Sequence, residues 1–344
     1  MADFHRLTID WYRQNKRDLP WRNTKNPYKI WLSEIILQQT RVDQGMNYYL
    51  KFIRNYPTIF DLANANEQDI LNDWQGLGYY SRARNLHFTA KYISTELNGI
   101  FPNQFTEIIK LKGIGEYTAS AIASFSFDLP YAVLDGNVYR VLSRVFDIST
   151  PIDSTEGKKE FQNLANELID RENPAEYNQS IMEFGAMLCT PANPNCETCP
   201  LSSKCLSFAN NTIKDRPLKE KKTKVRNRYF NFAIFKDNDQ ILIEKRIAKD
   251  IWQHLYQFPL FETEKEMNSQ EAISFFEEKL GLTPSDYSKP INHILSHQRI
   301  FTIFYEFNKL PEKIDHNWTK IDKSLIDNYP LPRVIDRYLE DHSL

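Results

Sequence analysis

The chain has 344 residues, more than one ordinary domain holds, and carries 43 Lys and Arg against 45 Asp and Glu, a net charge of −2. With 41% hydrophobic and 26% charged residues it has a globular composition, and no apolar run approaches the roughly 20 residues of a membrane span. The net charge by itself argues against a nucleic-acid partner, because proteins that bind duplexes usually carry a basic excess.

The N-terminal segment, residues 1–14, mixes charged and aromatic side chains and lacks the apolar core of a signal peptide. We therefore expect the protein to remain in the cytosol. Four cysteines are too few for a disulfide scaffold in a chain of this length.

Apolar residues recur at three- and four-residue spacing through most of the first 210 residues. The pattern is clearest over 30–39, 105–111 and 117–125. It predicts a region built from helices alone.

A turn with two glycines lies between two of these helical segments, at residues 111–119. Gly113 and Gly115 allow tight or left-handed backbone, and the next helix begins at once, so its free N–H groups point out of the turn. With Lys112, the turn is a candidate phosphate-binding site. A turn that needs glycine only for its geometry is the alternative.

All four cysteines lie within seventeen residues, at Cys189, Cys196, Cys199 and Cys205. Four thiolates this close, with prolines between them, indicate one metal centre. Zinc usually takes two paired C-x2–4-C knuckles, whereas only one close pair is present and a [4Fe–4S] cubane tolerates uneven spacing. The spacing favours a [4Fe–4S] cluster over zinc or purely structural thiols.

Residues 211–228 carry a net charge of +6, between a segment of −3 (1–210) and one of −5 (229–344). This stretch has few apolar residues to bury and many like charges, which predicts an extended linker. It is either a solvated tether or a tether that also follows phosphates.

After the linker the pattern changes from helical to strand-like. Aromatic and β-branched runs at 229–235, 240–244 and 300–307 predict strands, and 269–280 predicts one amphipathic helix that ends at Gly281. We expect an all-α region followed by a smaller α/β or α+β domain.

The order of helix, glycine hairpin, helix and four-cysteine loop resembles the endonuclease III superfamily of DNA glycosylases, over residues 1 to about 210. Within that superfamily the chain is most similar to MutY-type adenine DNA glycosylases. The matching stretches are 19–22 (LPWR), 27–42 (PYKIWLSEIILQQTRV), 76–87 (GLGYYSRARNLH), 134–144 (LDGNVYRVLSR) and 182–191 (MEFGAMLCTP). The resemblance implies an enzyme that flips adenine mispaired with 8-oxoguanine or guanine out of duplex DNA and excises it, leaving an abasic site.

Two carboxyl groups can divide this reaction between them, as in sugar hydrolysis. Glu34 lies in an apolar helical stretch, where burial would raise its pKa and suit a general acid; a surface glutamate is the alternative. Asp135 precedes Gly136 at a helix start, a setting that predicts a lowered pKa and an ionised stabiliser or nucleophile for the sugar. The resemblance assigns these two roles to Glu34 and Asp135.

Tyr117 stands where relatives with lyase activity carry a lysine. A tyrosine cannot form a Schiff base, so we expect little or no strand cleavage. Tyr117 can instead donate a hydrogen bond near the acid or the sugar, and Asn137 can orient Asp135.

The resemblance also places residues around the flipped base. A hydrogen-bonding amide at Gln179 could read an exocyclic amine and a ring nitrogen together. The family inserts wedge residues at Gln39 and Thr40 and at Leu77 and Tyr79, with Gln39 near the vacated position and Tyr79 beside the 8-oxoguanine. Leu77 and Tyr79 would otherwise be read as core or turn residues. Residues near the adenine are Arg17, Trp21, Arg22, Leu37 and Gln179.

Residues 229–344 resemble, more weakly, the Nudix-like 8-oxoguanine-reading domain of the same enzymes. The carboxylate set that binds Mg²⁺ in Nudix hydrolases is incomplete, which disfavours nucleotide hydrolysis. Ser296 and His297 match the loop that reads 8-oxoguanine, while a surface Ser and His is the alternative.

The expected partner is duplex DNA with an A:8-oxoguanine or A:G mispair, bound by a monomer in the bacterial cytosol or nucleoid. A further repair protein is expected, if anywhere, at the linker. The competing hypotheses are a bifunctional glycosylase/lyase for oxidised pyrimidines, a catalytically silent DNA-binding module and a Nudix hydrolase with a DNA-binding appendage.

Overall fold

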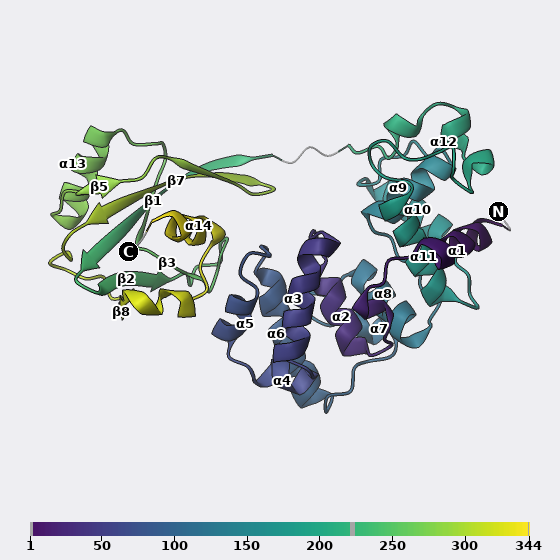
Figure 1. Cartoon of the computed structure of the whole chain (residues 1–344), viewed down its shortest axis with the longest axis horizontal. Coiled ribbons are helices and arrows are strands. Elements are labelled where there is room, and N and C mark those ends of the chain that lie inside the picture. The colour runs from purple at the N-terminus through teal and green to yellow at the C-terminus, as the bar shows by residue number, and fades with distance from the viewer. Residues whose placement is uncertain (1–2, 221–223, 343) are drawn as a thin grey trace. The chain divides into compact units, whose positions relative to one another are not determined.

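The computed structural model describes residues 3–220, 224–342 and 344. The chain divides into two compact units (Figure 1). Unit 1 comprises Met1–Asn64 and Asn85–Lys222, and unit 2 comprises Ala65–Arg84 and Thr223–Leu344. No helix in the described part of the chain is long and apolar enough to cross a membrane.

Unit 1 is built from helices. They are α1 (Phe4–Asn15), η1 (Pro20–Arg22), α2 (Pro27–Ile36), α3 (Val42–Asn55), α4 (Ile59–Asn64), most of α6 (Ser81–Glu96), α7 (Phe105–Ile108), α8 (Glu116–Phe127), α9 (Gly136–Val145), α10 (Thr155–Leu168), α11 (Pro174–Met187), η2 (Ser202–Lys204), α12 (Leu206–Ala209) and η3 (Ile213–Asp215). The prediction of an all-helical N-terminal region is confirmed.

Two helices of unit 1, α2 and α8, are buried nearly all round and pack against each other (Figure 1). A helix that is apolar on every face belongs in the interior. The start of α2 is fixed by Pro27 at its first position and by the side chain of Asn26, which accepts hydrogen bonds from the backbone N–H groups of Tyr28 and Lys29. The cap thus fixes the first residue of α2 and, with it, the positions of the side chains along the helix.

The first part of the basic stretch 211–228 packs on unit 1. Arg144 Nε donates to the carbonyl oxygens of Ile213 at 3.1 Å and Arg216 at 3.2 Å, and Arg216 forms an ion pair with Asp147 at 2.9 Å. Strand β1 then begins at Arg226. Residues 221–223 of the expected linker lie outside the described residues.

Unit 2 is a mixed sheet with two long helices, together with the 65–84 segment, which holds α5 (Glu67–Asp73) and the start of α6. Its long central strands, β1 and β7, pair in parallel from Arg226–Gln298 to Phe235–Phe307. The elements are β1 (Arg226–Asp237), β2 (Gln240–Lys245), β3 (Tyr256–Gln257), β4 (Leu260–Thr263), α13 (Ser269–Leu280), β5 (Asp286–Tyr287), β6 (Ile291–Ile294), β7 (Gln298–Phe307), β8 (Trp318–Asp322), η4 (Lys323–Asn328) and α14 (Arg333–Asp341).

Alternate residues of β1 face opposite sides of this sheet, as the strand period requires. Phe230 and Phe232 pack in the cluster that contains α14, and Ala233 and Phe235 pack in the cluster that contains α13. The unit therefore has three layers, a helix on each face of the sheet. The predicted α+β domain is confirmed.

The cap of α2 gives a first prediction. Asn26→Ala should lower the free energy of unfolding by about 1 kcal/mol, because two N–H groups at the helix start lose their acceptor. Asn66→Ala is the matched control, since the Asn66 side chain at the start of α5 makes no capping bond. Urea unfolding of both variants checks this, and equal losses would contradict it.

Candidate active site

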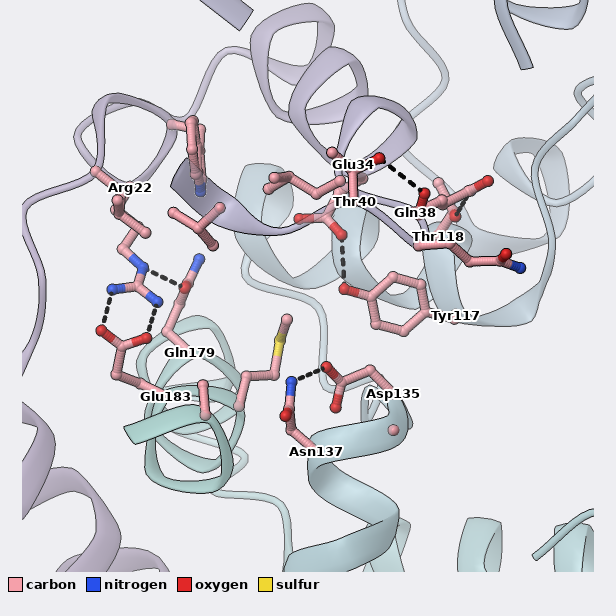
Figure 2. Close-up of a pocket in the computed structure, with 18 of the residues that line it drawn as sticks. Arg22, Glu34, Gln38, Thr40, Tyr117, Thr118, Asp135, Asn137, Gln179 and Glu183 are labelled. Carbon is pink, nitrogen blue, oxygen red and sulfur yellow. Dashed lines mark hydrogen bonds and ion pairs between the residues drawn. The ribbon is translucent and has the colours of Figure 1, made fainter. Parts of the chain in front are cut away.

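A cavity of about 710 Å³ opens in unit 1 where α2, the glycine hairpin, the start of α9 and one face of α11 meet (Figure 2). It gathers most of the candidate residues of the first 210 positions. Those that line it are Arg17, Trp21, Arg22, Glu34, Leu37, Gln39, Thr40, Gly113, Gly115, Tyr117, Asp135, Asn137 and Gln179.

Glu34 projects from α2 and is buried, with only 6% of its surface exposed. Burial raises the pKa of Glu34 to about 7; the charge of Asp135 acts in the same direction, while the Tyr117 hydrogen bond and Arg22 oppose it. Tyr117, in the first turn of α8, donates its hydroxyl to Glu34 Oε2 at 2.7 Å (Figure 2). A carboxyl with a pKa near neutrality can give up or take a proton at neutral pH.

Asp135 caps α9, and its carboxylate accepts from Val138 N and from Asn137 Nδ2, both at 2.7 Å. The expectation that this setting lowers the pKa of Asp135 is wrong in direction. Burial raises the pKa of Asp135, and the hydrogen bonds from Val138 and Asn137 only offset part of that effect. The same N–H donors still stabilise the ionised form over a carboxylate with no donors.

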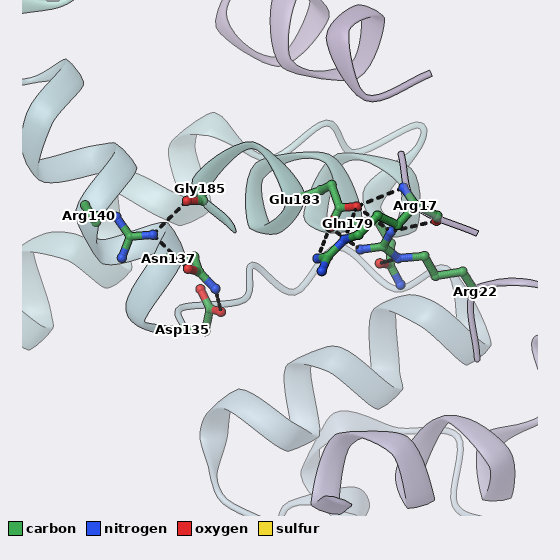
Figure 3. Close-up of polar contacts among 8 residues, drawn as sticks. All are labelled: Arg17, Arg22, Asp135, Asn137, Arg140, Gln179, Glu183 and Gly185. Atoms are coloured by element: carbon green, nitrogen blue, oxygen red, sulfur yellow. Dashed lines mark hydrogen bonds and ion pairs between the residues drawn. The ribbon is translucent and has the colours of Figure 1, made fainter. Parts of the chain in front are cut away.

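Asn137 is itself held in place. Its Oδ1 accepts from Arg140 Nη2 at 2.8 Å, and the same nitrogen donates to the carbonyl oxygen of Gly185 at 2.7 Å (Figure 3). Arg140 Nε donates to the carbonyl oxygen of Cys189 at 2.8 Å. Arg140 therefore connects the amide beside Asp135 to the end of α11 and the beginning of the cysteine loop.

Glu183, which the sequence did not single out, also lines the cavity. Its carboxylate is almost fully buried between Arg17 and Arg22 (Figure 3). Burial alone would raise its pKa, but the hydrogen bonds from Arg17 and Arg22 hold the pKa of Glu183 at about 2. The available signal was its spacing, since residue 183 is four after Gln179 and so lies on the same face of α11.

The turn after α2 carries Gln39 in the left-handed region, with φ of 55°. Non-glycine residues adopt this conformation rarely, and it is most frequent in turns and at functional sites. The neighbouring Gln38 donates from Nε2 to Thr118 Oγ1 at 3.2 Å, which ties the turn to α8.

The glycine hairpin has the conformation predicted for it. Gly113 has φ of 82°, and a Cβ there would lie 2.7 Å from the Cβ of Asn85. Gly115 is the N-cap residue of α8 and supplies no side-chain cap, so the first N–H groups of that helix remain available to an anion. Lys112 is not among the residues that line the cavity; its Nζ lies 4.1 Å from the ring centroid of Phe88.

A second cavity, of about 410 Å³, lies within unit 2 and brings together Leu77, Tyr79, Ser296 and His297. The Tyr79 hydroxyl and Ser296 Oγ are hydrogen-bonded to each other. Tyr79 has φ of 47°, and Trp252, a lining residue that the sequence did not indicate, has φ of 57°. The candidates at 77 and 79 therefore group with the 296–297 loop.

The four cysteines are partly exposed and form no disulfide. When ionised, Cys189, Cys196 and Cys205 influence the pKa of Cys199 through their charges. Burial, and after it the charges of Cys189, Cys205 and Cys196, raise the pKa of Cys199 to about 11. In residues 3–220, 224–342 and 344, no three His, Cys, Asp or Glu side chains are arranged to hold one metal ion. The charges of Cys189, Cys196 and Cys205 act on Cys199, so the four side chains lie near one another, as the ligands of one cluster would.

Comparison with known proteins extends these observations. The family model for HhH-GPD superfamily base excision DNA repair proteins matches residues 32–170, and the NUDIX domain model matches 231–341. The expected Nudix-like fold of the C-terminal domain is thereby confirmed.

Relatives match over most of the chain. An adenine DNA glycosylase of Buchnera aphidicola subsp. Baizongia pistaciae is 37% identical over 348 residues, covering 93% of this chain and 97% of its own. That of Buchnera aphidicola subsp. Acyrthosiphon pisum is 35% identical over 344 residues, covering 98% and 97%. Among solved structures, a thermostable thymine-DNA glycosylase superposes with a TM-score of 0.57 at 28% identity, covering 61% of this chain and 96% of that one.

The raised pKa of Glu34 predicts a pH-dependent effect on stability. The folded state holds the Glu34 proton up to a pH of about 7, whereas the unfolded state releases it near the ordinary glutamate pKa of 4.5. The stability that this proton provides is complete below pH 4.5 and is lost as the pH rises through about 7. Glu34→Gln, which cannot ionise, should therefore gain up to about 3 kcal/mol over the wild type at pH 8 relative to pH 4.

Melting temperatures measured between pH 4 and pH 8 check this prediction. Glu107→Gln, at an exposed glutamate on α7, controls for the removal of one carboxyl group. A constant difference between Glu34→Gln and the wild type across this range would contradict it.

Proposed function

Because the chain belongs to the adenine DNA glycosylases of the HhH-GPD superfamily, which act in base excision repair, we propose that it removes adenine mispaired with 8-oxoguanine or guanine. The product is an abasic site in duplex DNA. The observation that carries the proposal is the pairing, in one cavity, of a carboxyl with a pKa near neutrality and a second carboxyl with two N–H donors.

Glu34 is the general acid. With a pKa of about 7 it is protonated in roughly half of the molecules at neutral pH, and it gives its proton to a ring nitrogen of adenine. Protonation makes the base a better leaving group. The Tyr117 hydroxyl fixes the Glu34 carboxyl and moderates its pKa, so the proton is not held too tightly.

Asp135 acts on the sugar. As the N-glycosidic bond breaks, the deoxyribose acquires positive charge, which a nearby carboxylate stabilises directly or through a transient covalent bond that water then cleaves. Asn137 and the Val138 N–H stabilise the ionised form of Asp135 and orient it for this role.

Strand cleavage by a Schiff base requires a lysine at the reacting sugar. None of the described residues that line the cavity is a lysine, and Tyr117 stands where relatives with lyase activity carry one. This composition supports a glycosylase without lyase activity.

The adenine enters the cavity by flipping out of the duplex. Gln39 and Thr40, on the turn after α2, fill the vacated position, and the hairpin N–H groups with Lys112 bind backbone phosphates. Trp21, Arg22, Leu37 and Gln179 line the base pocket.

Cys189, Cys196, Cys199 and Cys205 hold a [4Fe–4S] cluster. When bound, the cluster crosslinks the 189–205 loop through four iron–sulfur bonds. Arg144 supports the loop by donating to the carbonyl oxygens of Thr190 at 2.7 Å and Pro191 at 3.0 Å.

Unit 2 reads the base opposite the adenine. The Ser296 hydroxyl and the His297 ring contact the N7–H or O8 that distinguish 8-oxoguanine from guanine, with Tyr79 beside them. The protein acts as a monomer on chromosomal DNA in the bacterial cytosol, and the basic stretch 211–228 is where a further repair protein would bind.

An excision assay tests the reaction. Duplexes with A opposite 8-oxoguanine should be cut only after alkali, and Glu34→Gln should lower the single-turnover rate by about 10²-fold or more. Borohydride should trap little covalent adduct. Glu107→Gln is the matched control, and strong adduct formation that depends on a lysine would refute the monofunctional reaction.

A second assay tests the role of unit 2. Ser296→Ala should reduce the preference for 8-oxoguanine over guanine opposite A, by roughly tenfold for one lost hydrogen bond. Ser269→Ala removes a similar serine–tyrosine pair, with Tyr287, on an exposed part of the same unit and should leave the preference intact. If both variants keep the preference, Ser296 does not read the oxidised base.

A further inference from the structure

The side-chain amide of Gln179 has one orientation in this structure. Its Oε1 accepts a hydrogen bond from Arg22 Nε at 3.0 Å (Figure 3). A guanidinium has donors only, so the oxygen of the amide must face Arg22 and the NH₂ group must face away. Figure 2 shows that NH₂ group directed into the cavity.

Arg22 is held in turn by Glu183. Its Nη1 and Nη2 donate to Glu183 Oε1 at 3.0 Å and Oε2 at 2.8 Å, and Nη1 also donates to the carbonyl oxygen of Arg17 at 3.1 Å. Both terminal nitrogens of the guanidinium, Nη1 and Nη2, thus donate to Glu183. Such a two-point contact fixes the plane of the guanidinium, and with it the direction of Nε.

Glu183 is itself held by several hydrogen bonds. Besides Arg22, it accepts from Arg17 N at 3.0 Å, Arg17 Nε at 2.9 Å and Arg17 Nη2 at 2.6 Å. Its side chain is 1% exposed and that of Arg22 10%, so solvent screens this contact little. The carboxylate anchors the segment between α1 and α2 to α11.

We propose that Glu183 is a positioning residue that, acting through Arg22, keeps the NH₂ group of Gln179 facing the cavity, so that the site requires a purine ring nitrogen at that point. The inference rests on the proposed excision of adenine. The oxygen of Gln179 is engaged by Arg22, so the amide offers its NH₂ group to the base as a donor.

In this arrangement the protonated Glu34 and the Gln179 NH₂ group are both donors that can face the base. Adenine offers three ring-nitrogen acceptors, at N1, N3 and N7, and can meet both donors at once. A base that presents an N–H at the position facing Gln179 would set two donors against each other, which leaves a buried polar group unpaired.

Base analogues test the inference. Single-turnover rates are measured on duplexes with adenine opposite 8-oxoguanine and on duplexes in which 1-deazaadenine, 3-deazaadenine or 7-deazaadenine, each with one ring nitrogen replaced by C–H, takes its place. On one of the three analogues the wild type should lose about tenfold or more in rate compared with adenine, a loss that Gln179→Met should not show. Glu183→Gln and Arg22→Lys should show the same loss of discrimination as Gln179→Met.

The variants separate positioning from folding. Arg22→Lys keeps a positive charge opposite Glu183 but has no Nε–H for the Gln179 oxygen. Glu176→Gln is the matched control, because Glu176 lies on the same helix and accepts two hydrogen bonds from Arg13 outside this cavity. If Glu183→Gln and Arg22→Lys slow all four substrates equally and keep the discrimination, Glu183 is only structural and the inference is wrong.

A measurement without DNA separates this inference from the proposed reaction. The Gln179 NH₂ signal in an ¹⁵N–¹H spectrum, assigned by its loss in Gln179→Met, should shift and exchange faster with solvent in Glu183→Gln but not in Glu176→Gln. An unchanged signal overturns the positioning role. Failure of the wild type to excise adenine, with the signal behaving as expected, would overturn the proposed function and its purine requirement but leave the positioning contact established.

Discussion

Glu34 places an ionisable carboxyl in the apolar interior of unit 1, and the Tyr117 hydroxyl donates a hydrogen bond to it. The other features of the site depend on this buried carboxyl. Burying a carboxyl without a partner is costly, and a buried glutamate avoids part of that cost by holding its proton. For this to happen, α2 must be buried nearly all round and must begin at a fixed residue, which Asn26 and Pro27 ensure. Helix α8 must then place a neutral donor, the Tyr117 hydroxyl, beside Glu34 and no positively charged side chain.

The same cavity contains a second glutamate with the opposite behaviour. Glu183 is buried as deeply as Glu34, yet its pKa is about 2 where that of Glu34 is about 7. Two guanidiniums and a backbone N–H surround Glu183, whereas Glu34 receives one neutral hydroxyl. Burial is common to both, so the partners determine which carboxyl is charged. One glutamate is thereby suited to proton transfer and the other to holding structure.

The parts of this arrangement that follow from local sequence could be predicted. The apolar period located α2 and α8, and the two glycines located the hairpin. The family resemblance singled out Glu34, Tyr117 and Asp135, which line one cavity. The features that depend on tertiary surroundings could not be predicted. The pKa direction of Asp135 was missed because capping is visible in sequence and burial is not. Glu183 was missed because its partners are about 160 positions away in the chain.

Unit 2 shows how a fold can keep its architecture while its acidic side chains serve other purposes. The NUDIX family model matches this unit, and its helix α13 carries three glutamates. Glu271 completes the capping box with Asn268, Glu277 accepts from Thr283 Oγ1 at 2.8 Å, and Glu278 pairs with Lys279. A Mg²⁺ site needs carboxylates that converge on one point, and here one of them closes the start of the helix while two lie at its end. The sheet and helices support the loop that carries Ser296, which suits the recognition role that we propose for this residue.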